Sequence, residues 1–222
     1  MTSSTSTNAH MIQAIFLDAA NTLLYKPALI PTMLNVLKRH GIKLPEVEFA
    51  SRHRWLSEVI VFPDRTSRDF YAEFNAQLLR SFGIIPNPDL LNEIFAACSY
   101  LPWHPFDDVS ALQTYPHPLG VLSNWNKSLP EQLALIPNIH FRWILGSEQE
   151  KVRKPELAFF QRIIDEAKLA PTQIAYVGDS LRLDIEPALI LGLSAFLIDR
   201  DNLYPYARVP RIRSLTELGH YL

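Results

Sequence analysis

The sequence predicts a doubly wound parallel α/β sheet that is interrupted by a helical insertion. Four short apolar runs each end on a small or acidic polar residue, which is typical of strands buried on both faces of a parallel sheet. Helix patterns separate the later runs, and this alternation favours right-handed crossover connections. Residues 26–105 show helix patterns without such runs. We therefore expect a Rossmann-like core that carries a small helical cap subdomain.

The four predicted strands end where a binding crevice is expected. They cover residues 13–17, 119–122, 174–177 and 195–198, and the helix patterns around them cover residues 129–135, 156–168 and 183–191. The first polar residues after the strands are Asp18, Ser123, Asp179 and Asp199. Because doubly wound sheets bind ligands beyond the carboxyl ends of their strands, we expect these residues to face one crevice.

The insertion is predicted to contain four helices, over residues 31–40, 46–60, 66–82 and 90–97. The third has the clearest pattern, because Phe70, Phe74, Leu78 and Phe82 recur every four residues and Gly83 follows. We expect this aromatic stripe to form the core of the insertion. The predicted organisation is a disordered tail over 1–11, an α/β core over 12–25 and 106–222, and a helical cap over 26–105.

Composition excludes several classes of function. The 222 residues include 21 Lys and Arg against 23 Asp and Glu, so no large charge attracts nucleic acid or an anionic membrane. A single cysteine, Cys98, forms no internal disulfide. The first residues lack a signal-peptide pattern, and the most apolar stretch, 187–198, is too short to span a bilayer. We expect a cytoplasmic protein, monomer or homodimer, with a small-molecule partner.

Acidic residues supply the first chemical signal. Asp18 follows the first strand in the stretch FLDAANTLL, where a carboxylate can act as a nucleophile or as a ligand for a hard cation. Asp179 and Asp184 lie five residues apart across a strand-to-helix turn in VGDSLRLD. This spacing lets one carboxylate reach a cation while the other braces its water shell.

Cationic and hydroxyl groups supply the second signal. Lys154 precedes Pro155, whose ring disfavours helix at the lysine and favours the first turn of the helix that follows. The ammonium group is therefore expected to project from a loop beside the strands. Ser123 and Asn124 end a strand, where a hydroxyl and backbone N–H groups can hold an anion.

Together, in this order, these motifs resemble the haloacid dehalogenase-like hydrolase superfamily, in the members whose helical cap follows the first motif. The matching positions are Asp18 to Thr22, Ser123, Lys154, Asp179 and Asp184. The resemblance implies a hydrolase in which Asp18 attacks phosphorus and forms an aspartyl-phosphate. It also implies a magnesium ion held by Asp18, the Ala20 carbonyl and Asp179. Asp184 would complete the metal site by bracing the waters around the ion.

The same resemblance assigns the substrate contacts. Lys154, Ser123 and Asn124 are expected to neutralise and orient the phosphoryl oxygens, because phosphoryl transfer depends on positioning and charge balance. Thr22 is expected to turn the chain out of the first strand and to bond the nucleophile through its hydroxyl. The predicted substrate-binding residues are thus Asn124, Thr22, Ser123 and Lys154, and the predicted catalytic residues are Asp18, Lys154 and Ser123.

One position departs from the family pattern. Phosphatases of this superfamily usually carry a second aspartate two positions after the nucleophile, where this chain has Ala20. Losing a general acid–base group typically costs ~10²- to 10⁴-fold in rate. We therefore expect weak turnover of poor leaving groups.

Three alternatives follow from that departure. Phosphonoacetaldehyde hydrolases carry alanine there but need a cap lysine, for which Lys26, Lys38 and Lys43 are the candidates. The 2-haloacid dehalogenases also lack the aspartate and work without metal, but they do not retain the acidic pair formed here by Asp179 and Asp184. The third alternative is a regulatory protein that binds a phosphorylated ligand and barely turns it over.

Two expectations concern the surroundings of these motifs. Trp125, beside Ser123, is expected to pack rather than to line a substrate pocket. The insertion carries basic residues interleaved with acidic ones, so we expect them to form a solvated face. The basic residues are Arg52, His53, Arg54, Arg65 and Arg68.

Overall fold

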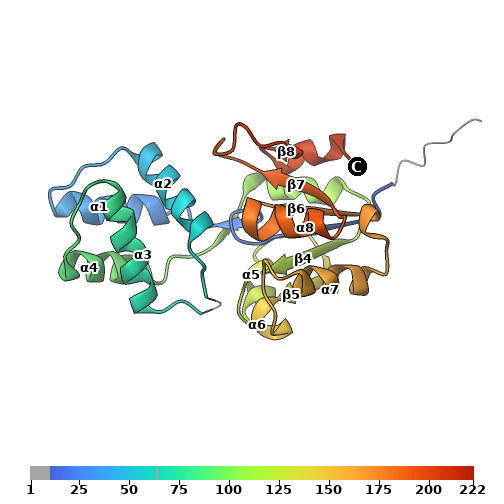
Figure 1. Cartoon of the computed structure of the whole chain (residues 1–222), viewed down its shortest axis with the longest axis horizontal. Coiled ribbons are helices and arrows are strands. Elements are labelled where there is room, and N and C mark those ends of the chain that lie inside the picture. Colours follow the sequence, from blue (N-terminus) through green and yellow to red (C-terminus); the bar gives the residue numbers. More distant parts are fainter. Residues whose placement is uncertain (1–10, 64) are drawn as a thin grey trace, which may run out of the picture.

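The computed structural model describes residues 11–63 and 65–222, and in it the chain forms an α/β core and a separate helical lobe (Figure 1). The predicted disordered tail over 1–11 lies outside the described residues except for Met11, which is exposed. The two lobes lie side by side along the longest axis of the molecule. The chain crosses between them twice.

The core is built on six strands in the order β5-β4-β1-β6-β7-β8, all paired in parallel. Their bounds are β1 Ala14–Leu17, β4 Leu119–Ser123, β5 Phe141–Gly146, β6 Ile174–Gly178, β7 Ser194–Ile198 and β8 Arg211–Ile212. The chain builds outward from β1 in both directions, so the strand order reverses at the centre of the sheet. This arrangement confirms the predicted doubly wound fold class and puts the expected crevice beside β1.

Helices cover both faces of the sheet and bury it completely at its centre. They are α5 Leu129–Leu133, α6 Ser147–Glu150, α7 Leu157–Ala167 and α8 Glu186–Ile190, with 3-10 turns at Asp107–Thr114, Pro171–Gln173 and Leu215–His220. Alternate residues of β1 serve opposite faces: Ile15 and Leu17 join one hydrophobic cluster, whereas Ala14 and Phe16 join the other. The continuous apolar run in the sequence follows from this two-sided burial.

Three core elements differ from the sequence prediction. Strand β5 was not expected, because it is partly exposed at Arg142 to Ile144 and lacks a continuous buried run. The helix predicted over 183–191 is divided into a π-helix, Leu181–Ile185, which Ser180 caps, followed by α8. Helix α7 begins at Leu157 with Glu156 as its N-cap, so Pro155 precedes the helix and does not form its first turn.

The helical lobe consists of α1 Leu29–Arg39, α2 Glu46–Val59, α3 Arg68–Ser81 and α4 Pro88–Cys98. Its hydrophobic cluster contains residues such as Phe49 and Leu78 and is separate from the two clusters of the core. The two crossings pair as a short antiparallel ribbon of β2 Leu24–Tyr25 and β3 His104–Pro105. The function of this lobe as a cap stays a prediction.

The aromatic stripe on α3 divides between two environments. Leu78 and, at its edge, Phe82 join the hydrophobic cluster of the lobe, as expected. Phe70 and Phe74 instead pack edge-on against Phe62, from the segment that follows α2. The stripe therefore stabilises both the lobe interior and the α2–α3 junction.

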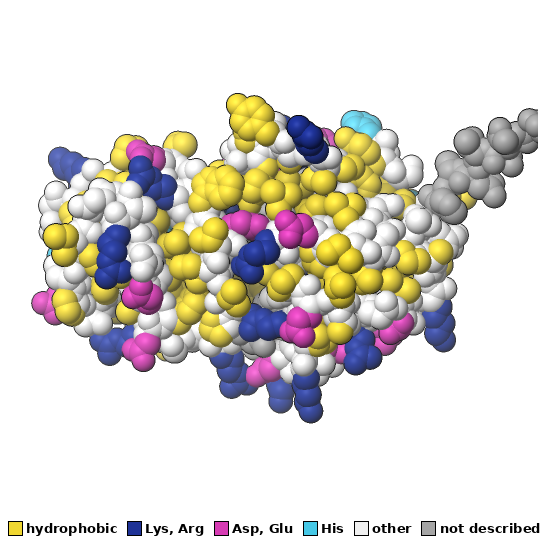
Figure 2. Space-filling model, in the orientation of Figure 1, with side chains coloured by type: hydrophobic (Ala, Val, Ile, Leu, Met, Phe, Trp, Pro, Cys, Tyr) yellow, Lys and Arg dark blue, Asp and Glu magenta, His cyan; other side chains and the backbone are white. Residues whose placement is uncertain are grey.

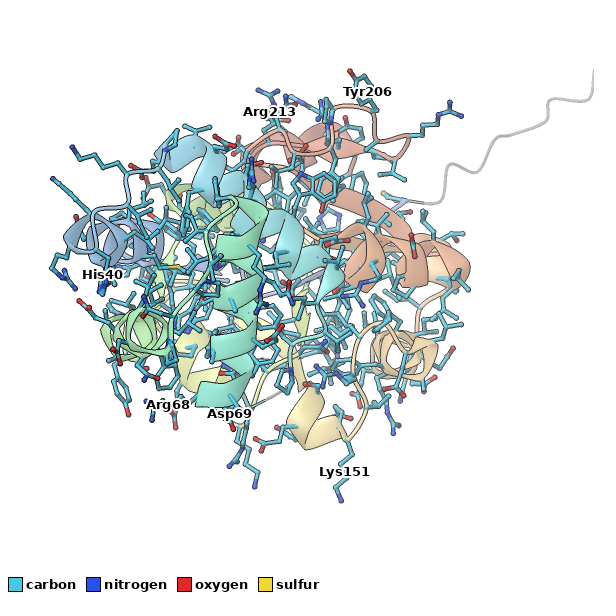
Figure 3. All side chains as sticks on the ribbon, turned by 60° about the vertical axis from the view of Figure 1, so that its left-hand side comes forward. His40, Arg68, Asp69, Lys151, Tyr206 and Arg213 are labelled. Carbon is cyan, nitrogen blue, oxygen red and sulfur yellow. The ribbon has the colours of Figure 1, made fainter. Side chains whose placement is uncertain are left out.

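The surface carries charges of both signs with no large single-sign patch on the face in Figure 2. Exposed charged side chains such as Lys151, Arg68 and Asp69 lie at the periphery of the protein (Figure 3). Within the described ranges, no helix combines the length and the apolarity that crossing a membrane requires.

The centre of the sheet offers a direct test of its packing. Gly120 of β4 lies against the buried Phe16 ring, which stacks on Trp143 at 5.1 Å, and a Cβ at this glycine would lie 2.3 Å from Phe16 Cε1. We expect Gly120→Ala to lower the free energy of unfolding by roughly 1–3 kcal/mol, because overpacking displaces side chains. Urea unfolding measures this. Gly146→Ala is the control, since its Cβ would meet nothing nearer than 3.4 Å; equal stability of the two variants would contradict the account.

Candidate active site

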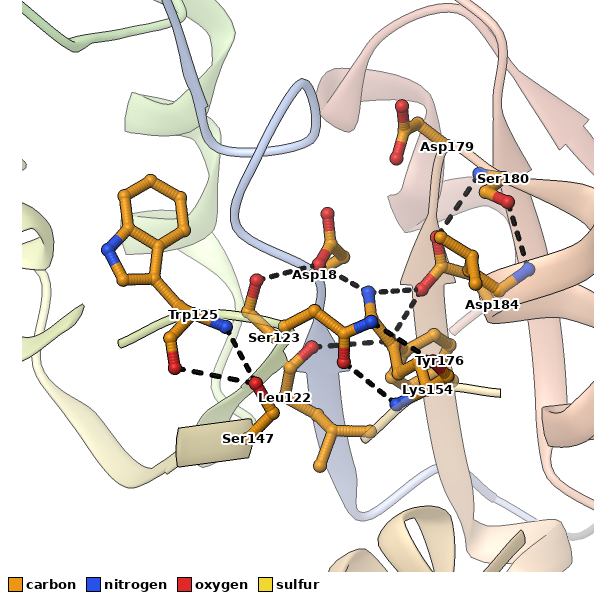
Figure 4. Close-up of polar contacts among 12 residues, drawn as sticks. Asp18, Leu122, Ser123, Trp125, Ser147, Lys154, Tyr176, Asp179, Ser180 and Asp184 are labelled. Atoms are coloured by element: carbon orange, nitrogen blue, oxygen red, sulfur yellow. Dashed lines mark hydrogen bonds and ion pairs between the residues drawn. The ribbon is translucent and has the colours of Figure 1, made fainter. Parts of the chain in front are cut away.

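Three neighbouring strands deliver polar side chains to one point of the core. Asp18 follows β1, Ser123 ends β4 and Asp179 follows β6, and β1 lies between the other two strands. The carboxyl ends of parallel strands meet at one edge of the sheet, so these side chains converge (Figure 4). Asp199, after β7, is not grouped with these acids: its carboxylate accepts hydrogen bonds from Leu203 N, Tyr204 N and Arg211.

Asp18 is at the centre of the site and is almost completely buried, with 3% of its surface exposed. Its Oδ1 accepts hydrogen bonds from Ser123 Oγ at 2.9 Å and from Lys154 Nζ at 2.5 Å. No hydrogen bond from residues 11–63 or 65–222 reaches its Oδ2. One carboxylate oxygen is thus fixed while the other is available.

Lys154 joins Asp18 to a second buried acid. Its Nζ donates at 2.7 Å to Asp184 Oδ1, which also accepts from Tyr176 Oη at 2.9 Å. The other Asp184 oxygen accepts from Ser180 N at 3.1 Å. Both Asp184 oxygens therefore accept hydrogen bonds, and this carboxylate helps to orient the Lys154 ammonium.

Glycine at position 178 makes this arrangement possible. A Cβ there would lie 2.3 Å from Asp184 Cγ, so any larger residue would displace the acid. Tyr176 is fully buried in β6 and donates to the same carboxylate. Sequence reasoning missed its contribution, because a tyrosine in a buried strand carries no signal that distinguishes a hydrogen-bonding role from packing.

The acids form a compact anionic cluster. One oxygen each from Asp18, Asp179 and Asp184 lies within 4.8 Å of the other two. Burial raises the pKa of Asp18 to about 7, partly opposed by the Lys154 charge and reinforced by the neighbouring carboxylates. Burial alone would lower the pKa of Lys154, but the charges of Asp18 and Asp184 outweigh it and raise that pKa. The ammonium therefore stays charged and is the counter-ion of two acids.

The donor set fits a hard divalent cation. Carboxylate oxygens are the ligands that Mg²⁺ prefers, and a cation would offset negative charge that Lys154 neutralises only in part. Asp179 Oδ1 accepts no hydrogen bond from the residues that the structure describes, so this oxygen is available to a metal ion, and the Asp18 carboxylate lies beside it. The acidic cluster could therefore bind a metal ion.

Two predicted contacts can be compared with the structure. Asn124 donates its amide to Lys154 O at 3.0 Å and accepts from Lys154 N at 2.8 Å, so its side chain fixes the lysine loop, and its contact with a phosphoryl group stays a prediction. The Thr22 hydroxyl is buried and has no hydrogen-bond partner among the described residues, so the expected bond to the nucleophile is absent. Ala20 forms an isolated β-bridge with Leu24 in the turn after β1.

The solvated face predicted on the insertion is wrong for two residues. Arg54, on α2, hydrogen-bonds Asp179 Oδ2 through its guanidinium and is only 22% exposed in its side chain. Burial, followed by the Arg54 charge, lowers the pKa of His53 to about 4, so this imidazole is neutral. The sequence pattern RHR gave no way to separate Arg54 from Arg52, which lies at the surface and pairs with Glu48.

Two further expectations can be compared with the structure. Trp125 packs in a core cluster, with its ring 4.8 Å from that of Trp103, so it is a packing residue as expected. Burial lowers the pKa of Lys26, one of the candidate lysines, and its ammonium lies 5.0 Å from the Trp103 ring centroid. The catalytic and binding roles assigned to site residues stay predictions.

Comparison with known proteins identifies relatives along most of the chain. A sequence profile of the haloacid dehalogenase-like hydrolases matches residues 12–192. The mouse haloacid dehalogenase-like hydrolase domain-containing protein 3 is 26% identical over 207 residues, which cover 83% of this chain and 82% of the mouse protein. Its human counterpart is 32% identical over 108 residues, or 47% of this chain and 43% of the human protein.

Solved structures share the fold. The HAD-hydrolase YfnB from Bacillus subtilis, bound to magnesium, has a TM-score of 0.63 at 20% identity, covering 95% of this chain and 98% of that chain. A 2-haloacid dehalogenase from Pseudomonas syringae has a TM-score of 0.56 at 23% identity, covering 95% and 97%. At these identities the likeness concerns the fold alone. Because the family profile matches well over half of this chain, the chain belongs to the haloacid dehalogenase-like hydrolases.

Proposed function

We propose that the protein is a magnesium-dependent hydrolase of small phosphorylated molecules and that Asp18 is its nucleophile. The observation that carries this proposal is the state of the Asp18 carboxylate. One oxygen is held by Ser123 and Lys154, and the other is available within a cluster of acids that could bind a cation. Asp18, Asp179 and the Ala20 carbonyl would hold the ion, with Asp184 braced behind them.

The reaction divides into two displacements at phosphorus. Asp18 Oδ2 attacks the phosphorus atom while the bond to the leaving oxygen breaks, giving an aspartyl-phosphate. Water then attacks that phosphorus, which releases inorganic phosphate and restores the carboxylate. When bound, the magnesium ion neutralises charge on the transferring phosphoryl group.

The chain's own residues position the reacting atoms. Ser123 and Lys154 hold Asp18 Oδ1, which fixes the direction of the attacking oxygen. The Lys154 ammonium also balances charge on the phosphoryl oxygens. Because residue 20 is alanine, the leaving oxygen must take its proton from solvent, so we expect slow turnover of alkoxide leaving groups and faster turnover of acyl and aryl phosphates.

A second candidate function is metal-independent dehalogenation of 2-haloacids. The observation that favours it is that Asp179 is already paired with a cation, Arg54, while Asp18 remains poised by Lys154. Halide release from 2-chloropropionate in the presence of EDTA would distinguish this reaction from phosphate release that requires magnesium.

The location and partners that we propose for the enzyme follow from its amino-acid composition. A formal net charge of -2 and a single cysteine favour a cytoplasmic enzyme that acts on small molecules as a monomer or homodimer. Neither nucleic acid nor a membrane surface is proposed as a partner.

Removing the nucleophile should abolish turnover. We expect Asp18→Asn to lower the magnesium-dependent hydrolysis of p-nitrophenyl phosphate and acetyl phosphate by about 10³-fold or more, because the amide is not nucleophilic. EDTA should do the same to the unmodified protein. Asp165→Asn, at an exposed position on α7, is the matched control. Turnover that survives in Asp18→Asn would rule out the aspartyl-phosphate mechanism.

Restoring the missing acid should help poor leaving groups. We expect Ala20→Asp to raise the hydrolysis of alkyl phosphates by ~10²-fold while changing aryl phosphates much less, because only alkoxides need a proton donor. Steady-state rates measure the effect. Ala20→Asn has nearly the same shape without an acidic proton, so an equal gain in that variant would show that proton donation is not the cause.

The raised pKa of Asp18 also predicts a pH dependence of stability in the metal-free protein. The pKa rises from 3.8 to about 7 on folding, so the folded state favours the protonated acid and loses stability as pH rises through about 7. Asp18→Asn lacks this titration. In EDTA, the melting temperature of Asp18→Asn should therefore rise relative to that of the unmodified protein between about pH 4 and about pH 7. A difference that stays constant with pH would contradict the assigned burial cost.

A further inference from the structure

Arg54 belongs to the helical lobe but contacts the acidic cluster of the core. Its guanidinium hydrogen-bonds Oδ2 of Asp179, the acid that follows β6. The two side chains are 22% and 10% exposed, so solvent shields this pair much less than it shields a surface ion pair. The mechanism proposed above assigns no part to this cation.

Other contacts hold α2 against the core and keep Arg54 in place. Arg182 donates from its backbone N and from Nε to the side chain and the backbone of Glu58, both at 2.9 Å. The Trp55 ring packs edge-on against Tyr204, with centroids 5.2 Å apart. In Figure 1, α2 is the helix of the lobe that lies next to the core. Contacts between α2 and the core therefore hold the Arg54 guanidinium at the acidic cluster.

A metal ion and the Arg54 guanidinium would compete for the Asp179 carboxylate. The guanidinium occupies one oxygen of this carboxylate, and its positive charge would repel a divalent ion nearby. Binding of the ion would therefore weaken or break the pair. After release, the guanidinium would still lie close to Asp18, because an Asp179 oxygen is within 4.8 Å of an Asp18 oxygen.

We propose that Arg54 exchanges partners when the ion and the substrate bind, from Asp179 to the phosphoryl group of the substrate. Three carboxylates and a phosphate dianion outweigh the charge of a divalent ion and one ammonium, so the guanidinium has an anionic partner to take. Its planar fork of donors suits phosphate oxygens. This inference rests on the proposed function, because it takes the substrate's anion to be a phosphoryl group.

The exchange predicts effects of opposite sign in one variant. Calorimetric titration would measure the binding of Mg²⁺ alone, and then of inorganic phosphate at saturating Mg²⁺, in the unmodified protein and in Arg54→Gln. We expect Arg54→Gln to bind Mg²⁺ several-fold more tightly, because a competitor is lost, and to bind phosphate about tenfold more weakly, because a charge-assisted hydrogen bond is lost. Arg54→Lys should retain part of the phosphate affinity.

A neighbouring arginine supplies the matched control. Arg52 lies on the same helix, pairs with Glu48 and stacks on the Phe82 ring at 4.1 Å, away from the acidic cluster. Arg52→Gln should therefore match the unmodified protein in both titrations. A residue that merely supports the fold would weaken both ligands when replaced, so the opposite signs distinguish exchange from structural support.

The outcomes separate this inference from the proposed function. Unchanged or weaker Mg²⁺ binding by Arg54→Gln, or unchanged phosphate binding, would overturn the exchange. Turnover of p-nitrophenyl phosphate by the unmodified protein is measured in parallel. Opposite-sign binding without turnover would overturn the proposed hydrolysis and leave the exchange standing, whereas turnover without opposite-sign binding would do the reverse.

Discussion

The buried ammonium of Lys154 is the interaction on which the rest of the site depends. It lies between Asp18 and Asp184 and neutralises acids that would otherwise be costly to hold in the interior. Neighbouring residues serve this placement: Asn124 fixes the backbone of the lysine, and Gly178 leaves room for Asp184. A buried charge network of this kind has to be satisfied throughout, because one missing partner leaves an unpaired charge.

The sheet was largely predictable because its central strands are buried on both faces. In β1 and β6 every residue is buried, so the sequence shows a continuous apolar run that ends where the strand ends. Strand β5 escaped prediction because it lies at the edge of the sheet and exposes part of its length. The π-helix after Asp179 also escaped prediction, because the apolar spacing over residues 183–191 does not distinguish a π-helical turn from an α-helix.

The positions of the side chains around Asp18 could be predicted where they follow directly from the ends of strands. Asp18, Ser123 and Lys154 meet as their order along a doubly wound sheet requires. Arg54 could not be predicted, because its role depends on how the helical lobe docks on the core, which involves contacts more than 100 residues apart in sequence. The orientation of the Asn124 amide likewise depends on a loop that only the folded chain brings near.

The proposed metal site requires that Asp18 and Asp179, from separate strands, share one cation. Crystals grown with Mn²⁺ would test it directly, because the ion can be located by its anomalous diffraction. We expect one peak bonded to oxygens of Asp18 and Asp179, at distances normal for hard divalent ions. An acidic cluster that stays free of Mn²⁺, with the ion bound elsewhere or not at all, would contradict it.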